Sequence, residues 1–279
     1  MKIVWFRSLL LVAIFAMSAN VMADLSQQQL DKFFDEGLVV IPNFFNKQEV
    51  TQAAASADRL YKQAQILAKD QTGKVMYKGT QIVIAKVGAE NEVLRIVWAG
   101  AAEPQLLKLA RQSKLLVPVG QILGSDKADQ LNNQLHYKFP NGGDTLTWYQ
   151  DIRNRKNFDP EWRDLNAKGS FILAIIAIDP LNVEKGTIYY VPKSHTRGDL
   201  SLDQINDPVE LNKIAHIDEA VPLLLNPGDL VLWHPYLIHG SDPNQFATAR
   251  RIFINGFSYP GANTKPYPGE GSAQSVDLR

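Results

Sequence analysis

The sequence has no cysteine and only five histidines among its 279 residues. Without thiols the chain can form no disulfide framework, no cysteine-ligated zinc or iron–sulfur site and no thiol nucleophile. A metal site would have to be built from histidine, aspartate, glutamate or tyrosine side chains. The small number of histidines therefore restricts where a metal could bind.

An excess of charge and the common nucleotide motifs are also absent. Lys and Arg number 29, as do Asp and Glu, so the formal charge is zero and gives no basic footprint for nucleic acid. No G-x-G-x-x-G, P-loop or G-x-S-x-G pattern occurs, which argues against a dinucleotide-binding, NTP-hydrolysing or serine hydrolase fold. The apolar fraction of 45% is large enough to build a substantial core, which excludes a wholly disordered chain.

The first 23 residues have the pattern of a secretory signal peptide. Lys2 and Arg7 form a positive region before the apolar run 9–17, and Val21 and Ala23 stand at a small-residue cleavage site. The apolar run is shorter than the ~20 residues that a spanning helix needs. We expect cleavage before Asp24 and export to the periplasm or the medium. The mature chain would then have no membrane segment and a net charge of minus two, from 27 basic and 29 acidic residues.

The chain after residue 23 changes character near Leu131. Its first half has helical periodicity and two capping-box starts, at Ser26 and Asn46. Its second half has short β-rich runs between Pro, Gly and Asn clusters, which predicts a jelly-roll core with packed N-terminal helices. We expect one domain over 24–260 and a flexible Gly/Pro-rich tail over 261–279. The predicted strands of the second half are 133–139, 145–150, 171–178, 187–191, 220–225, 230–234 and 251–259.

Three segments carry polar residues within otherwise apolar strands, at 147–155, 182–198 and 226–251. In this order and spacing, together with the opening pattern LSQQQLDKFFDEGLVVIPNFF, they resemble the phytanoyl-CoA dioxygenase family. The resemblance runs from about Leu25 to Tyr259. It implies a double-stranded β-helix fold and an oxygenase that uses iron(II) and 2-oxoglutarate. Such an enzyme binds iron through two histidines and one carboxylate, which leaves three coordination positions for cosubstrate and oxygen.

The resemblance assigns roles to individual residues. His239 and Asp151 match two of the iron ligands, and Arg250, eleven residues after His239, matches the arginine that binds the distal carboxylate of 2-oxoglutarate. Ser241 matches a serine whose hydroxyl contacts the same carboxylate. The family pattern W-H-x-D reads W-Y-Q-D here, so Tyr149 occupies the position of the first histidine ligand.

Three outcomes are open for the third iron position. Tyr149 could itself ligate the metal, although a neutral phenol is a poor ligand and its reference pKa is about 10. His136 or His234 could complete the set from a neighbouring strand or turn. Alternatively, the site could have lost catalysis and the fold could serve binding.

Two hypotheses about function follow. The first is an exported dioxygenase that hydroxylates a small organic substrate, using iron held by Asp151, His239 and Tyr149, with Arg250 and Ser241 binding 2-oxoglutarate. The second is a non-catalytic binding or structural protein on the same fold, because fold and function separate readily. The sequence indicates neither the substrate nor the oligomeric state.

Overall fold

The computed structural model describes residues 24–87, 89–140 and 146–279. The predicted signal peptide lies outside these ranges. Within them, no helix combines the length and apolarity needed to cross a membrane. The helices of eight or more residues are α1 (Gln27–Glu36), α2 (Lys47–Ala68), α4 (Ser113–Leu123), α5 (Asp151–Phe158) and α6 (Pro208–Ala215), and α3 (Pro104–Ala110) is shorter.

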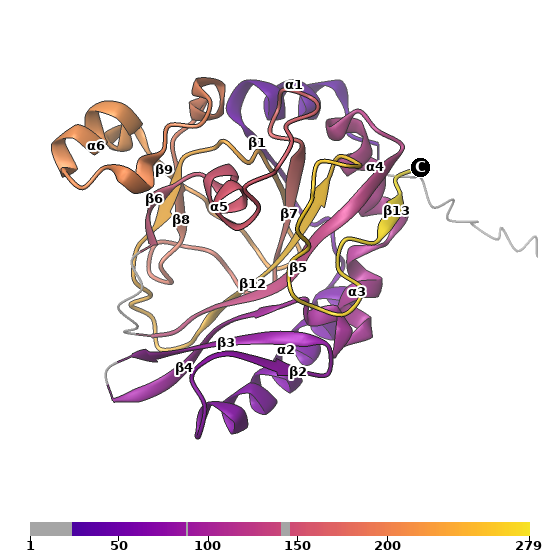
Figure 1. Ribbon diagram of the computed structural model, residues 1–279, viewed down its shortest axis with the longest axis vertical. Coiled ribbons are helices and arrows are strands. Elements are labelled where there is room, and N and C mark those ends of the chain that lie inside the picture. The colour runs from indigo at the N-terminus through magenta and orange to yellow at the C-terminus, as the bar shows by residue number, and fades with distance from the viewer. Residues whose placement is uncertain (1–23, 88, 141–145) are drawn as a thin grey trace, which may run out of the picture.

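Two antiparallel sheets form the centre of the molecule (Figure 1). The large sheet has the order β1-β10-β7-β12-β5-β4-β3-β2, and β13 also pairs with β5; the small sheet has the order β6-β11-β8-β9. The strands of the large sheet are β1 (Leu38–Ile41), β2 (Gly73–Tyr77), β3 (Thr80–Val87), β4 (Glu90–Val97), β5 (Lys127–Lys138), β7 (Phe171–Ala177), β10 (Leu230–Trp233), β12 (Arg250–Ser258) and β13 (Ser275–Asp277). Those of the small sheet are β6 (Leu146–Tyr149), β8 (Ile188–Tyr190), β9 (Val221–Pro222) and β11 (His239–Ser241).

The N-terminal helices begin where the sequence predicts. Ser26 and Asn46 each form a capping box, with Gln29 and Glu49 respectively, so the first free N–H groups of α1 and α2 are satisfied. Gly37 ends α1 in a left-handed conformation at φ 90°, which a residue without Cβ adopts at little cost. The following strand β1 therefore turns directly onto the edge of the large sheet beside β10.

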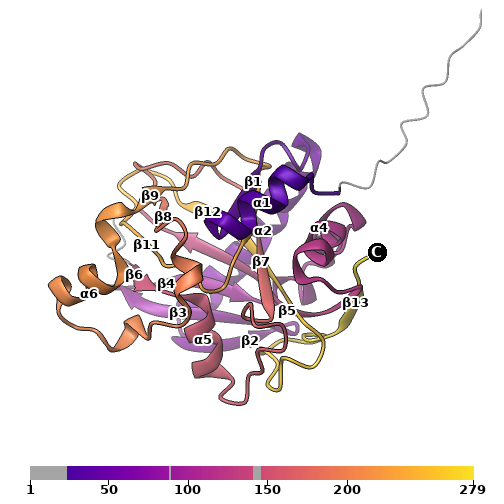
Figure 2. The same ribbon diagram turned by 90° about the horizontal axis from the view of Figure 1, so that it is seen from above.

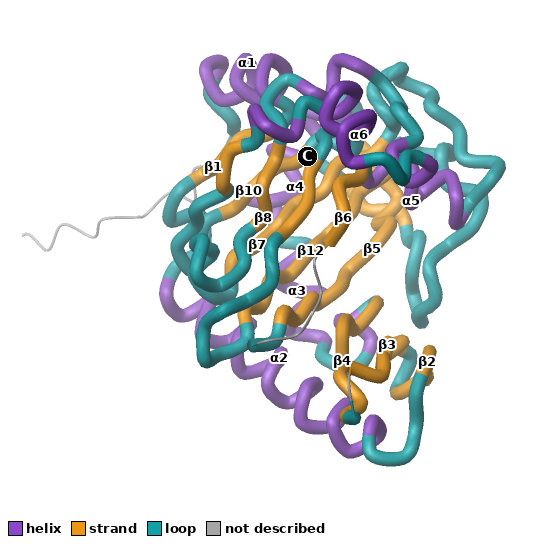
Figure 3. The backbone as a smooth tube through the Cα atoms, turned by 90° about the vertical axis from the view of Figure 1, so that its left-hand side faces the viewer, coloured by secondary structure: helices purple, strands orange, loops and turns teal. Residues whose placement is uncertain are grey.

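Alternation along the strands divides the apolar residues between two cores. Phe253 of β12 and Leu135 of β5 belong to the core under α1 to α4, whereas Ile252 and Ile254 belong to the core that faces the small sheet. In Figure 3 most strands lie in the middle, with α1, α5 and α6 above them and α2 below, while β2, β3 and β4 lie at the lower right. Side chains of even-numbered β12 residues therefore point into the space between the sheets, where a jelly-roll fold carries its site.

The predicted fold class agrees with this architecture, but the strands β2, β3 and β4 were missed. These strands extend the large sheet along α2 (Figure 1). Residues 73–97 are mixed in polarity, and β2 is largely exposed, so no clean alternation marks it as a strand. The tail, which the sequence predicts to be flexible, makes regular contacts in the structure: β13 pairs with β5, and Leu278 is buried.

Candidate active site

Asp151 and His239 meet at one end of the space between the sheets. His239 begins β11 and Asp151 is the first residue of α5, directly after β6. The Nε2 atom of His239 lies 3.7 Å from the Oδ2 atom of Asp151, and both side chains are largely buried. The two residues that the sequence assigns to metal binding are therefore brought together, although 88 positions separate them.

A hydrogen bond fixes which nitrogen of His239 faces the carboxylate. Nδ1 lies 2.8 Å from the carbonyl oxygen of Leu237, so Nδ1 carries the proton and donates it there. Nε2 then presents a lone pair to Asp151, and two acceptors at this separation repel each other unless a cation or proton lies between them. In histidines that bind metals, the ring nitrogen that does not face the metal usually donates to a carbonyl or carboxylate oxygen in this way.

Gln150, directly before Asp151, fixes the start of α5. Its Nε2 donates to the carbonyl oxygens of Gly198 and Tyr236 at 2.7 and 2.6 Å, and its Oε1 accepts from the N–H of Leu200. Burial raises the pKa of Asp151, and the neighbouring His239 opposes that rise. A positive ion at this position would remove the cost of burying the carboxylate, because an opposite charge favours the ionised form.

Tyr149 occupies the position where the family pattern has histidine. It pairs with His239 across β6 and β11, and the two ring centroids are 4.2 Å apart. Burial raises the pKa of the Tyr149 phenol, Asp151 adds to the rise, and the positive charges of Arg95 and Arg250 oppose it. Without a bound metal the side chain is therefore a neutral phenol at neutral pH.

Arg250 is the first residue of β12, and its side chain also points into the space between the two sheets. It is only 4% exposed, and its Nε atom has no hydrogen-bond partner. Burial lowers its pKa to about 10, so the guanidinium is still charged at neutral pH. Beside it, Lys138 on the paired strand β5 donates to Ser241 Oγ at 2.6 Å. A buried cation with an unused donor, next to a hydroxyl and an ammonium, fits a carboxylate.

Arg251 points the other way, as alternation along the strand predicts. Its guanidinium contacts Asp179 at 2.8 Å and Asp58 of α2 at 2.6 Å. The register of eleven residues after His239 therefore selects the inward arginine, Arg250.

Neither of the two alternative histidines joins Asp151 and His239. Across the described part of the chain, no group of three or more His, Cys, Asp or Glu residues could hold a metal ion. His136 does face the space between the sheets, where burial lowers its pKa to about 3, and its Nε2 has no partner. His234 follows Trp233 on β10 and contacts Phe33 and His195 under α1, so alternation turns it away from the site.

His234 gives the protein a predictable pH dependence. Burial lowers its pKa to about 3, below the unfolded value near 6.5, so protonation favours unfolding. Its contribution to stability is therefore complete above about pH 6.5 and is lost as the pH falls toward 3. We expect the drop in Tm between pH 7 and pH 4 to be smaller in His234→Gln than in the wild type. The surface variant His216→Gln is the control; an equal drop in all three proteins would contradict this assignment.

Two cationic residues were missed by sequence reasoning: Lys138, which is buried at the site, and Arg95, which is exposed at its edge. Arg95 lies opposite His136 in the β4–β5 register, and Lys138 lies opposite Arg250 in the β5–β12 register. Both stand on strands whose sequence shows no motif, and only the pairing of the sheet brings them to this face. The one available signal was the i, i+2 relation of His136 and Lys138 on an extended segment.

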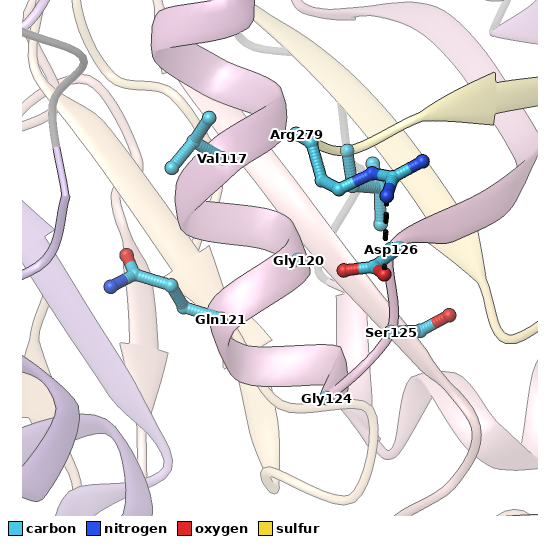
Figure 4. A pocket seen from close by; sticks show the side chains of 8 residues that line it. Val117, Gly120, Gln121, Gly124, Ser125, Asp126 and Arg279 are labelled. Carbon is cyan, nitrogen blue, oxygen red and sulfur yellow. Dashed lines mark ion pairs between the residues drawn. The ribbon is translucent and has the colours of Figure 1, made fainter.

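The site is distinct from the open surface hollow near the C-terminus. That hollow is lined by α4, the turn after it and the last two residues, and Figure 4 shows the ion pair between Arg279 and Asp126 at its rim. None of the residues around Asp151, His239 or Arg250 lines it.

A largely buried imidazole–carboxylate pair and a buried arginine between two antiparallel sheets are the arrangement expected of a jelly-roll oxygenase. The phytanoyl-CoA dioxygenase family model matches residues 33–252, which is most of the chain, so the chain belongs to that family. The predicted family, fold class and 2-oxoglutarate-dependent dioxygenase class are thereby confirmed, as is the cofactor pair of iron and 2-oxoglutarate.

Similar proteins of known name span most of the chain. A methylphosphonate hydroxylase of Gimesia maris is 26% identical over 233 residues, covering 81% of this chain and 78% of that protein. A probable alpha-ketoglutarate-dependent hypophosphite dioxygenase of Stutzerimonas stutzeri is 26% identical over 262 residues, covering 88% and 82%. The crystal structure of EctD from S. alaskensis with bound Fe has a TM-score of 0.68 at 19% identity, covering 89% and 81%. That last likeness shows the shared fold.

Proposed function

We propose that Asp151 and His239 bind iron(II), that Tyr149 occupies the third protein position, and that Arg250 and Ser241 bind 2-oxoglutarate. The observation that carries this proposal is the 3.7 Å approach of His239 Nε2 to Asp151 Oδ2, in the same space as the buried guanidinium of Arg250. Two ligands on one divalent ion, each with a bond of about 2.1 Å, span such a separation. The donor set therefore fits a metal with two conventional ligands and a phenol.

Other residues of the chain orient the proposed metal ligands and shield the proposed 2-oxoglutarate site from water. Leu237 fixes the tautomer of His239, and Gln150 fixes the start of the helix that carries Asp151. Arg250 supplies a buried positive charge, so a carboxylate bound to it would be shielded from water. When bound, iron and 2-oxoglutarate supply the activation of oxygen that the side chains cannot provide.

We propose further that the substrate is a small anion. Arg95 and His136 lie opposite one another in the β4–β5 register, and the positive charge of Arg95 acts on both His136 and Tyr149. The relatives named above act on methylphosphonate and, probably, hypophosphite, which are both small phosphorus oxyanions. Together these features favour a substrate with one compact anionic group near the metal.

The test is 2-oxoglutarate turnover by the purified protein with iron(II) and oxygen. We expect succinate to form in the presence of iron(II), and its rate to rise when the correct small phosphonate, phosphinate or carboxylate is added. His239→Ala should remove the turnover, whereas His216→Gln should not. Turnover that persists in His239→Ala would contradict the proposed metal site.

A binding protein on the same fold is the second candidate. The observation that favours it is the neutral phenol of Tyr149 at the position of a histidine ligand. A chain of this kind would bind 2-oxoglutarate or a related dicarboxylate through Arg250 without consuming it. Tight binding measured by calorimetry, together with no succinate under any metal, would favour this candidate over the enzyme.

We propose that the protein is exported and that the mature chain begins at Asp24. The side chain of Leu25 is buried, and its N–H donates to Gln121 of α4, so cleavage before Asp24 would leave this anchor intact. N-terminal sequencing of the protein secreted by an expressing cell should read Asp-Leu-Ser. An unprocessed N-terminus on protein recovered from the cytoplasm would contradict export.

A further inference from the structure

The segment Asn263–Tyr267, which we call the strap, is bound along α5. It lies beyond residue 252, where the family match ends. In Figure 2 the yellow C-terminal segment starts on the α5 side of the molecule and ends at β13. The strap therefore lies outside the part of the chain that the family model covers, and its contacts show what it does.

Asp159, at the C-terminal end of α5, holds the beginning of the strap. Its Oδ2 atom accepts from the N–H groups of Thr264 and Lys265 at 2.8 and 3.0 Å, and its Oδ1 accepts from the Thr264 hydroxyl. Burial alone would raise the pKa of Asp159, but these bonds and that from Arg155 lower it to about 2. The carboxylate is thus ionised and fully engaged at neutral pH.

Arg155 fixes the middle of the strap from within the helix. The two hydrogens of its Nη2 atom are shared among the carbonyl oxygen of Lys265 at 2.7 Å, Asn263 Oδ1 at 3.0 Å and Asp159 Oδ2 at 2.9 Å, whereas its Nε and Nη1 atoms have no hydrogen-bond partner. Only 1% of the side chain is exposed. A buried charge with several hydrogen bonds is costly to disturb, so the strap and the helix are joined rigidly here.

Tyr267 closes the strap over the same face of the helix. Its ring stacks on Phe158 with centroids 4.7 Å apart, and the Arg155 guanidinium lies 4.8 Å from its centroid. Asp151, Arg155 and Phe158 are spaced i, i+4 and i+7, so all three lie on one helical face. The strap therefore covers the face of α5 that begins at the proposed metal ligand.

The opposite side of α5 is held more weakly. Arg153 pairs with Asp203 and Lys156 with Asp199, and these ion pairs are partly exposed. Exposed pairs of this kind contribute little to stability, about 1 kcal/mol or less. The strap is accordingly a stronger attachment than these ion pairs. The start of α5 is held separately, by the buried Ile152, whose N–H donates to the carbonyl oxygen of Pro235, and by Gln150.

We propose that the strap is a positioning element of the active site, in which Tyr267 and Arg155 lock α5 and thereby hold the Asp151 carboxylate against His239. The inference rests on the proposed function for the role of Asp151 as a ligand. Tyr267 is a positioning residue in this account, since its ring packs on the helix. Substitutions in the strap would then change metal affinity, although no strap residue touches the metal.

The experiment compares three variants of the full-length mature protein with Mn(II) as the probe. Mn(II) affinity is followed by the EPR signal of the free ion, and hydrogen exchange reports on the peptide covering α5. We expect Tyr267→Ala to weaken Mn(II) binding by about tenfold, the range seen when second-shell partners of a ligand are removed. Tyr267→Phe keeps the stacked ring and should bind within about twofold of the wild type, as should Arg153→Gln on the opposite side.

Hydrogen exchange separates the inference from the proposed function on which it rests. Faster exchange of α5 in Tyr267→Ala, but not in Tyr267→Phe, is expected whether or not metal is present. If the wild type binds no Mn(II), the proposed metal site fails, and exchange alone decides whether the strap locks the helix. Unchanged Mn(II) affinity in Tyr267→Ala would overturn the inference where the wild type binds the ion, and unchanged α5 exchange would overturn it in every case. Should Tyr267→Ala not fold, Thr264→Val, which removes one bond to Asp159, replaces it.

Discussion

Replacing Arg250 with leucine is expected to weaken 2-oxoglutarate binding by about thirtyfold or more while leaving the protein folded. The guanidinium is buried and has an unused Nε donor, so a bound carboxylate would gain charge-assisted hydrogen bonds away from water. Removing one partner of such a buried pair costs about 2–5 kcal/mol of binding free energy, and each 1.4 kcal/mol is about tenfold in affinity. In the protein without ligand, the same substitution removes a charge whose burial is unfavourable, so the free energy of unfolding should hardly fall.

The neighbouring arginine provides the matched control. Arg251→Gln removes the ion pairs with Asp179 and Asp58, so it should lower Tm while 2-oxoglutarate affinity stays near that of the wild type. Calorimetric titration with 2-oxoglutarate and thermal unfolding of both variants measure the two effects separately. If both substitutions weakened binding equally, or if Arg250→Leu bound normally, Arg250 would not be the carboxylate site.

Tyr149→His is expected to tighten iron(II) binding at least tenfold, which is about 1.4 kcal/mol. The substitution adds an imidazole next to His239, because residues 149 and 239 are paired across β6 and β11 with ring centroids 4.2 Å apart. Three ligands from histidine and carboxylate then form the facial set that suits iron(II). A neutral phenol with a raised pKa must first lose its proton to contribute as much.

The measurement is competition for iron(II) against a chelator of known affinity, without oxygen. Tyr149→Phe serves as the control, because it keeps the ring and removes only the hydroxyl. Affinity that falls in Tyr149→Phe would show that the phenol already ligates the metal. Equal affinity in the wild type, Tyr149→Phe and Tyr149→His would contradict the placement of residue 149 beside the ion.

The sequence could predict those features whose physical cause lies in neighbouring residues of the chain. The family resemblance implied that Arg250 faces the site, and alternation on a strand then places Arg251 on the opposite face. The capping boxes at Ser26 and Asn46 predicted two helix starts, because their hydrogen bonds are local in sequence. In both cases the physical cause lies within a few positions of the residue concerned.

The remainder depended on contacts between distant segments. Lys138 and Arg95 reach the site because β5 pairs with β12 and with β4, and no local pattern encodes those pairings. Helix α5 has few apolar residues and so no helical periodicity in the sequence, because its Arg155 is buried by residues more than 100 positions later. Whether His136 or His234 lies beside Asp151 and His239 depends on which face of its strand each side chain occupies, and only the structure shows that.

The central claim, that Asp151 and His239 bind a metal to which 2-oxoglutarate is also bound, is tested most directly by one titration. The purified mature protein is titrated without oxygen with iron(II) in the presence of 2-oxoglutarate, and the metal-to-cosubstrate charge-transfer absorption is recorded. The account predicts that this band appears with saturation at one iron per chain and is absent from His239→Ala and Arg250→Leu. The account would be contradicted if the wild type bound 2-oxoglutarate but showed no such band when iron(II) was added.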